Sequence, residues 1–374
     1  MPAFPKKPAV LHVLEAMEGG TRRHVCDLLP QLSARGYSVA LATSFRRNPA
    51  LRDDITPALA SCGIPVHELP MRRAIAPLAD ARAALRLSRL VRTLNPDILH
   101  THSAKAGILG RLTGAAHGIP VVHTPHAFPF LMEGGRCKKG LYRFFERLAQ
   151  PTTAALIAVS QEEARAAREI GFPPGRIHHI PNGIGTPPQP PPATPPLQAI
   201  AFFGRLSRQK GVDLLLRAVA NLDIETHIHG RGEDEAALRR QCQSRGLGQR
   251  VRFMGECPQS DITARMRDYP MIVIPSRWEG CPYVVLDAFA AGVPVLATRV
   301  GGIPDLIQDG ANGTLIPAED VPALSAAIAA LLQSPTRRRG IATAAQQSLS
   351  RHTLTAMADS IERVYHKVAM PSCR

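Results

Sequence analysis

The chain alternates short runs of Val, Ile and Leu with longer segments of helical periodicity, and this alternation limits its fold more than any other feature. Helical patterns occupy, for example, residues 77–94 and 161–170. Strands that alternate with helices build βαβ units and a parallel sheet, so we predict a doubly wound α/β domain over residues 1–185. Its predicted strands are AVLHVL from Ala9, SVALATS from Ser38, DILHTH from Asp97, PVVHTPH from Pro120 and AALIAVS from Ala154.

The same alternation begins again after a proline-rich segment. Residues 186–197 include TPPQPPPATPP, whose prolines favour an extended linker. We predict a second Rossmann-like domain over residues 198–353 and a helical tail over residues 354–374. A chain of 374 residues is long enough for two domains, and a cleft between domains is a favoured ligand site. The later predicted strands are AIAFFGRL from Ala199, ETHIHGRG from Glu225, VRFMGE from Val251, MIVIPS from Met271 and PVLATR from Pro294.

Charge and composition narrow the class of partner. The chain is 45% hydrophobic and 20% charged, which indicates a globular protein, and its formal net charge of +15 favours phosphates or anionic lipid. No aromatic residues interleave with the basic ones in a nucleic-acid motif, so we expect no nucleic-acid partner. The basic pairs are either solvated surface or contacts to an anionic membrane: Arg22-Arg23, Arg46-Arg47, Arg72-Arg73 and Lys138-Lys139.

The cysteines and the hydropathy pattern indicate a cytoplasmic location. The seven cysteines include no C-x-x-C pair, and the first residues, MPAFPKKPAVLHVL, lack the layout of a signal peptide. No apolar run approaches the roughly 20 residues that cross a bilayer. We therefore expect reduced thiols and, at most, peripheral contact with the inner face of the cytoplasmic membrane.

Two loops carry residues suited to binding an anion. Gly19-Gly20 lies between the first predicted strand and a helix, where exposed backbone amides either bind an anion or simply form a tight turn. In FGRLSRQKG, Arg205 follows a strand and Lys210 precedes a helix, so both cations can meet one diphosphate. The alternative for Arg205 and Lys210 is a solvated basic loop.

The segment SRWEGCPYVVLDAFAAGVPVLATRVGGIPDLI carries two acidic residues near a helix start. Pro282 suits the first turn of that helix. Asp287 follows Glu279 by eight residues, about two helical turns, so we expect both carboxylates at one cleft mouth, accepting hydrogen bonds from sugar or ribose hydroxyls. The alternative is one acid that favours the helix dipole and one that is exposed.

Several close pairs of histidines raise the question of a metal site. The chain has no D-x-D, H-E-x-x-H or Cys/His cluster to accompany them, so we expect no metal. The pairs are His100 with His102, His123 with His126, and His227 with His229.

These motifs, in this order, resemble retaining glycosyltransferase family 4. Glu279 and Asp287 stand where that family has E-x7-E, ahead of AGVPV and Gly301-Gly302-Ile303-Pro304; GRLSRQKGVD from Gly204 and IPNG from Ile180 match two further motifs. The resemblance implies a GT-B fold. In that fold two Rossmann-like domains face each other across a cleft, and the last helix crosses back to the first domain.

The resemblance also assigns roles to individual residues. It implies that Arg205 and Lys210 hold the donor diphosphate with Gly19-Gly20, and that Asp287 contacts the ribose, where the family usually has the longer Glu. Glu279 would contact the transferred sugar and is, with His126, one of the two implied catalytic residues. His126 in HTPHAFPF resembles the family's cleft histidine; His123 is the competing residue, and His102 is a weaker candidate.

The function that follows is retaining transfer without a metal or other cofactor. We expect a hexose or N-acetylhexosamine to move from a nucleotide-diphosphate sugar, with a UDP-sugar favoured, to a saccharide or polyprenyl-linked acceptor. The resemblance points to bacterial polysaccharide or envelope-glycan synthesis. The alternatives are a GT-B sugar-nucleotide epimerase and a noncatalytic sugar-nucleotide binding protein.

Overall fold

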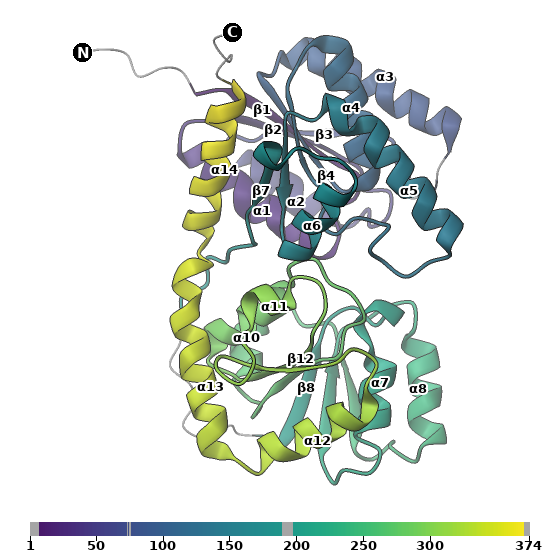
Figure 1. Cartoon of the computed structure of the whole chain (residues 1–374), viewed down its shortest axis with the longest axis vertical. Coiled ribbons are helices and arrows are strands. Elements are labelled where there is room, and N and C mark those ends of the chain that lie inside the picture. The colour runs from purple at the N-terminus through teal and green to yellow at the C-terminus, as the bar shows by residue number, and fades with distance from the viewer. Residues whose placement is uncertain (1–6, 73, 75, 189–196, 370–374) are drawn as a thin grey trace, which may run out of the picture. The chain divides into compact units, whose positions relative to one another are not determined.

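The computed structural model describes residues 7–72, 74, 76–188 and 197–369 (Figure 1). Most of the predicted proline-rich linker, and Arg73 of the predicted basic pair, lie outside the described residues. The chain divides into two units. Residues 1–182 with 354–374 form the N-terminal unit, and residues 183–353 form the C-terminal unit.

The N-terminal unit is built on a parallel sheet with the strand order β3-β2-β1-β4-β5-β6-β7. Its strands are β1 (Ala9–Leu14), β2 (Ser38–Thr43), β3 (Val66–Glu68), β4 (Ile98–His102), β5 (Val121–Thr124), β6 (Ala155–Ala158) and β7 (Ile177–His179). Its helices are α1 (Gly19–Ala34), α2 (Leu51–Ala60), α3 (Pro77–Leu94), α4 (Ala104–His117), α5 (Arg136–Ala149), α6 (Gln161–Glu169) and α14 (Leu354–Ala369).

Helices cover both faces of this sheet, which explains why its strands are apolar on both sides. Val10 and Leu14 of β1 pack against α1 and α14, whereas Leu11 and Val13 pack against α3 and α4. Helix α14 lies along α1 although the two are far apart in sequence (Figure 1). The side chain of His12 points to the face with α1 and α14, because it alternates with its neighbours along β1.

The C-terminal unit repeats this architecture with the order β10-β9-β8-β11-β12-β13, again parallel. Its strands are β8 (Ala199–Phe203), β9 (Glu225–His229), β10 (Val251–Gly255), β11 (Ile272–Ile274), β12 (Val295–Thr298) and β13 (Thr314–Ile316). Its helices are α7 (Val212–Ala218), α8 (Glu235–Ser244), α9 (Ile262–Met266), α10 (Tyr283–Ala291), α11 (Ile303–Leu306), α12 (Val321–Leu332) and α13 (Pro335–Ser348).

Two parallel-sheet α/β domains are therefore confirmed. The two ends of the C-terminal unit pair with each other: the Ile184 N–H donates to the His352 carbonyl at 2.9 Å, beside a parallel bridge from Ile184 to Thr353. Among the described residues, no helix combines the length and apolar character required to span a bilayer.

Candidate functional site

Each sheet has a topological switch point, where successive connections leave in opposite directions. In the C-terminal unit this point lies between the neighbouring strands β8 and β11, and in the N-terminal unit between β1 and β4. Ligands of open α/β sheets bind outside the carboxyl ends of the strands at such points. The predicted site residues Arg205, Lys210 and Glu279 follow β8 and β11, and Gly19-Gly20 follows β1.

Lys210 and Glu279 form an ion pair at the C-terminal switch point. Lys210 closes the 3₁₀ turn Arg208–Lys210, and its Nζ lies 2.6 Å from Oε1 of Glu279. Ser276 Oγ donates to the same oxygen at 2.7 Å. The Glu279 side chain is only 5% exposed, so the lysine compensates a carboxylate that water barely reaches.

Two glycines let the loops around this pair approach one another closely. Gly211 has φ +67°, and a Cβ there would lie 2.0 Å from the Pro275 carbonyl oxygen. Gly301 has φ +57°, and a Cβ there would lie 1.9 Å from the Glu279 carbonyl oxygen. Both backbones require glycine for conformation and for space.

Arg277 joins the same loops and was missed by the sequence analysis. Its guanidinium pairs with both carboxylate oxygens of Asp213, at 2.7 and 2.8 Å, and with Glu319. Its backbone N–H donates to the Gln209 carbonyl, and the Gln209 side chain donates to the Trp278 carbonyl. Although burial opposes its ionisation, the pKa of Asp213 is lowered by the hydrogen bond and charge of Arg277.

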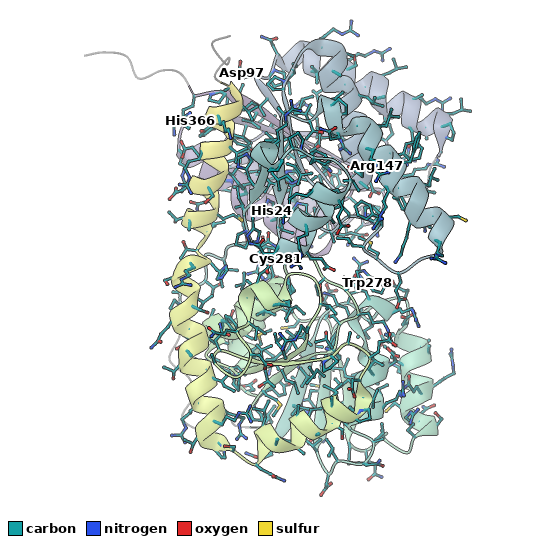
Figure 2. All side chains as sticks on the ribbon, in the orientation of Figure 1. His24, Asp97, Arg147, Trp278, Cys281 and His366 are labelled. Atoms are coloured by element: carbon teal, nitrogen blue, oxygen red, sulfur yellow. The ribbon has the colours of Figure 1, made fainter. Side chains whose placement is uncertain are left out.

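The remaining predicted donor residues differ in accessibility. Arg205 is exposed directly after β8. Asp287 lies in α10 and is only 2% exposed. The helix begins at Tyr283, so Glu279 precedes it in the loop that Trp278 and Cys281 flank in Figure 2. The prediction that helical turns relate the two carboxylates was therefore wrong, and Pro282 lies at the N-cap rather than in the first turn.

In the N-terminal unit, Gly19 begins α1 with φ +53°, and Gly19 and Gly20 are both exposed. The N-cap residue Glu18 makes no side-chain capping hydrogen bond to the helix, and it pairs instead with Arg47 at 2.5 Å. Exposed amides at a helix N-terminus are suited to an anion, which is one of the two alternatives that the sequence left open for Gly19-Gly20.

The predicted cleft histidine belongs to a larger group of histidines on the α1 and α14 face of the sheet. His126 follows β5, and its Nε2 lies 3.0 Å from Nδ1 of His102. Nε2 of His102 lies 3.0 Å from Nδ1 of His12. The His24 ring packs edge-on against His126, with centroids 4.7 Å apart, and His100 neighbours His102 on β4.

Burial keeps these rings neutral at neutral pH. It lowers the pKa of His12 to about 3 and that of His24 to about 4. Burial, with smaller contributions from neighbouring imidazoles, also holds the pKa values of His100, His102 and His126 well below the ordinary range. Each neutral ring has one N–H donor and one acceptor nitrogen, as histidine chains require.

His123, the competing residue, lies on the opposite face. Its Nδ1 lies 2.9 Å from Thr101 Oγ1, and a Cβ on Gly107 of α4 would lie 2.4 Å from its ring. His123 is thus packed under α4, whereas His126 and His102 meet at the switch point. His12 and His24 were not predicted from the sequence, and His100 was noted only as a close pair with His102; that spacing of two, on a strand next to β1, was the available signal.

Comparisons with known proteins place the whole chain among glycosyltransferases. The model of the glycosyl transferase 4-like domain matches residues 19–183, and that of glycosyl transferases group 1 matches residues 191–348. The chain is 30% identical to the UDP-Gal:alpha-D-GlcNAc-diphosphoundecaprenol alpha-1,3-galactosyltransferase of Escherichia coli, over 67% of this chain and 70% of that one. It is 28% identical to the phosphatidyl-myo-inositol mannosyltransferase of Mycobacterium leprae (strain TN), over 94% of both chains.

Solved structures show the same fold at low identity. Anabaena Alr3699/HepE, in complex with UDP and glucose, superposes with a TM-score of 0.80 at 19% identity, over 96% of this chain and 100% of that one. The sucrose-phosphate synthase of Thermosynechococcus elongatus superposes with a TM-score of 0.83 at 20% identity, over 96% and 98%. The predicted GT-B fold is thereby confirmed.

Proposed function

Because the chain belongs to the GT-B glycosyltransferases of the family 4 type, we propose that it moves a hexose or N-acetylhexosamine, with retention, from a nucleotide-diphosphate sugar to a saccharide or polyprenyl-linked acceptor. The ion pair of Lys210 and Glu279 at the switch point carries this proposal, since it sets a cation for phosphate beside a carboxylate for hydroxyls. The relative named for UDP-Gal and the UDP complex of HepE support a UDP-sugar. The diphosphoundecaprenol acceptor of that relative supports a role in envelope polysaccharide or glycolipid synthesis.

Each predicted site residue has a role toward the donor in this proposal. Arg205 and Lys210 bind the diphosphate, together with the amides of Gly19-Gly20 at the start of α1. When Lys210 exchanges Glu279 for phosphate oxygens, the carboxylate of Glu279 accepts hydrogen bonds from the transferred sugar. His126 lies beside that sugar. Asp287 contacts the ribose, which requires local opening because this side chain is buried.

In this proposal the acceptor hydroxyl attacks the sugar from the same face that the diphosphate leaves. The bond from the anomeric carbon to the diphosphate oxygen breaks, its electron pair goes to the phosphate, and the acceptor oxygen bonds to the same face of the carbon. The leaving phosphate takes the proton of the acceptor hydroxyl. Arg205, Lys210 and the backbone amides stabilise the developing phosphate charge, so the step proposed here uses no metal.

A donor screen tests the reaction. UDP-, GDP-, ADP- and dTDP-sugars are compared for thermal stabilisation of the protein and for slow hydrolysis without acceptor. We expect a UDP-sugar to stabilise most and to be hydrolysed to UDP and free sugar. Stabilisation by none of the donors would contradict the transferase proposal, and conversion of the donor to its epimer would support the epimerase instead.

Arg205→Ala tests the diphosphate contact. A hydrogen bond between charged groups contributes about 1.5–3 kcal/mol, so we expect UDP affinity to fall by roughly 10- to 100-fold in calorimetry. Arg240→Ala, which removes another exposed arginine of the same unit, is the matched control and should bind UDP normally. Equal affinities of the two variants would exclude Arg205 from the donor site.

We also propose that α5 docks the protein on an anionic membrane. Its exposed side chains Leu141, Phe144, Phe145 and Leu148 follow the spacing i, i+3, i+4, i+7, and form one apolar stripe. Basic residues accompany the stripe: Arg136, Lys138, Lys139, Arg143 and Arg147. An amphipathic helix with aromatic and cationic residues is suited to lie in the interface of anionic lipids, where a polyprenyl-linked acceptor is anchored.

Vesicle pelleting tests this surface. We expect salt-sensitive binding to phosphatidylglycerol vesicles, weak binding to phosphatidylcholine vesicles, and loss of binding in Phe144→Ser/Leu148→Ser. Leu78→Ser is the matched control, because Leu78 is 79% exposed on α3. Equal pelleting of the α5 variant and the control would refute docking through α5.

A further inference from the structure

Three histidines of the N-terminal unit lie close enough to share one ligand. His24 lies on α1, where Figure 2 labels it, His102 ends β4, and His126 follows β5. One ring nitrogen of each lies within 4.8 Å of the others. His24 and His102 are buried, and His126 is partly exposed.

His24 presents a lone pair that no described residue uses. Its Nδ1 lies 3.0 Å from the amide oxygen of Asn182, and because that oxygen only accepts, Nδ1 carries the proton. Its Nε2 is buried and has no hydrogen-bond partner among the described residues. A ring held through one N–H by an amide oxygen, with its other nitrogen unpartnered, is the arrangement of a metal ligand.

A chain of hydrogen bonds is compatible with the tautomer of His102 that a metal ligand needs. Its Nε2 meets His12, His12 Nε2 lies 3.2 Å from Tyr365 OH, and Tyr365 OH lies 2.6 Å from Nδ1 of His100. His100 Nε2 lies 2.8 Å from Thr124 Oγ1. One order of donation runs from His102 through His12, Tyr365 and His100 to Thr124. In this order each imidazole carries one proton, and Nδ1 of His102 keeps a lone pair that faces His126.

The backbone positions His126 for the same role. His126 has φ +55° and Ala127 has φ +78°, a conformation that non-glycine residues rarely adopt. The carboxylate of Glu163 fixes this backbone segment, because it accepts hydrogen bonds from the Ala127 N–H at 2.7 Å and from the Val159 N–H at 2.7 Å. Strain of this kind is found where a side chain must be aimed at a site.

We propose that Nε2 of His24, Nδ1 of His102 and Nε2 of His126 bind a divalent d-block cation, with Zn²⁺ as the reference ion. Zinc bonds imidazole nitrogen at about 2.0–2.1 Å, so tetrahedral ligand atoms lie roughly 3.3 Å apart, close to the 3.0 Å between His102 and His126. The fourth position lies on the partly exposed His126 side and takes water or an anion. His12, His100 and Tyr365 form the outer shell, because their ring and hydroxyl atoms are engaged with one another.

Metal titration of the chelator-stripped protein tests this site without donor or acceptor. We expect one Zn²⁺ per chain in calorimetry, and visible absorption of tetrahedral Co²⁺. Loss of an outer-shell partner already costs 10–100-fold in metal affinity, so His24→Gln and His126→Ala should each weaken binding by at least about 100-fold. His366→Ala, which removes an exposed histidine of α14, is the matched control and should bind as the unmodified protein does.

Thermal unfolding in EDTA shows whether each variant is folded. A further variant, Asn182→Leu, keeps all three histidine ligands but loses the hydrogen bond to Nδ1 of His24. We expect it to bind with an intermediate affinity. Unchanged binding in His24→Gln and His126→Ala, or no tetrahedral Co²⁺ spectrum, would overturn the site. Inhibition of transfer by Zn²⁺ follows only if His126 acts as proposed above, whereas metal binding itself is independent of that role.

Discussion

Replacing Lys210 with methionine removes the cation of the ion pair at the C-terminal switch point and leaves Glu279 charged and buried. Breaking a buried pair on one side costs about 3–5 kcal/mol. The Lys210 side chain is 20% exposed and Ser276 still donates to the carboxylate, so we expect the low end, a loss of about 3 kcal/mol in free energy of unfolding. For a unit of this size that is roughly 6–12 °C in Tm.

The chain offers a selective probe for this measurement. Trp278 is its single tryptophan and stands next to Glu279, so tryptophan fluorescence during urea denaturation follows the C-terminal unit. Arg299→Met is the matched control because Arg299 pairs with Asp309 on the surface, where both side chains are about half exposed. We expect that variant to lose less than about 1 kcal/mol.

A double variant separates the pair from other effects of the lysine. In Lys210→Met/Glu279→Gln neither side chain of the pair is charged, and the amide oxygen still accepts from Ser276. We expect it to regain at least about 2 kcal/mol relative to Lys210→Met, as coupled residues do. Two results would contradict this expectation: a double variant that is no more stable than Lys210→Met, or a Lys210→Met variant that loses no more free energy of unfolding than Arg299→Met. Either result would mean that Lys210 does not stabilise the buried carboxylate of Glu279.

Three further outcomes follow from the packing of the two units. Glu146→Leu leaves the fully buried Arg111 without the carboxylate that lies 2.8 Å from it. The free energy of unfolding, followed by circular dichroism in urea, should fall by roughly 3–5 kcal/mol, and a fall of less than about 1 kcal/mol would contradict the pairing. Gly301→Ala should displace the Glu279 loop and weaken UDP binding at least about 10-fold in calorimetry, which unchanged affinity would refute. Burial lowers the pKa of His229 from 6.5 to about 4, so below pH 6.5 the unfolded chain binds a proton at this residue that the folded C-terminal unit does not. The free energy of unfolding of that unit should therefore fall by up to about 1.4 kcal/mol per pH unit down to pH 4. His229→Gln should remove this contribution to the slope, and an unchanged pH profile would refute it.

The sequence predicted most strands of both sheets, including the three-residue β11 in the middle of its sheet, and missed three short ones. β3, β7 and β13 were overlooked, and each has three residues and lies at the edge of its sheet. An edge strand pairs on one side only and needs no continuous apolar run, as VHE in β3 and IHH in β7 illustrate. Periodicity has too few residues to act on in such strands.

The sequence predicted which residues belong to the candidate site better than it predicted their contacts with one another. Motif order located Lys210 and Glu279, but their direct pairing depends on two loops 69 residues apart in sequence. The histidine group was harder to predict, because which face of a strand a residue occupies, and which helix covers it, follow only from the assembled sheet. His12 occurs within an apolar run, and that pattern gives no sign that Tyr365, 353 residues later, completes its hydrogen bonds.

Tyr365 has a consequence for how this protein is made. A chain emerging from the ribosome exposes β1, β4 and β5 early, with His12 and His100 on a sheet face that α14 later covers. Domains usually fold in order of synthesis, but this one lacks Met357, Ile361 and Tyr365 of its core until translation has passed residue 365. The N-terminal unit is therefore the first to begin folding and the last to finish, and a nascent chain stalled within the C-terminal unit would still lack the helix whose Tyr365 contacts His12 and His100.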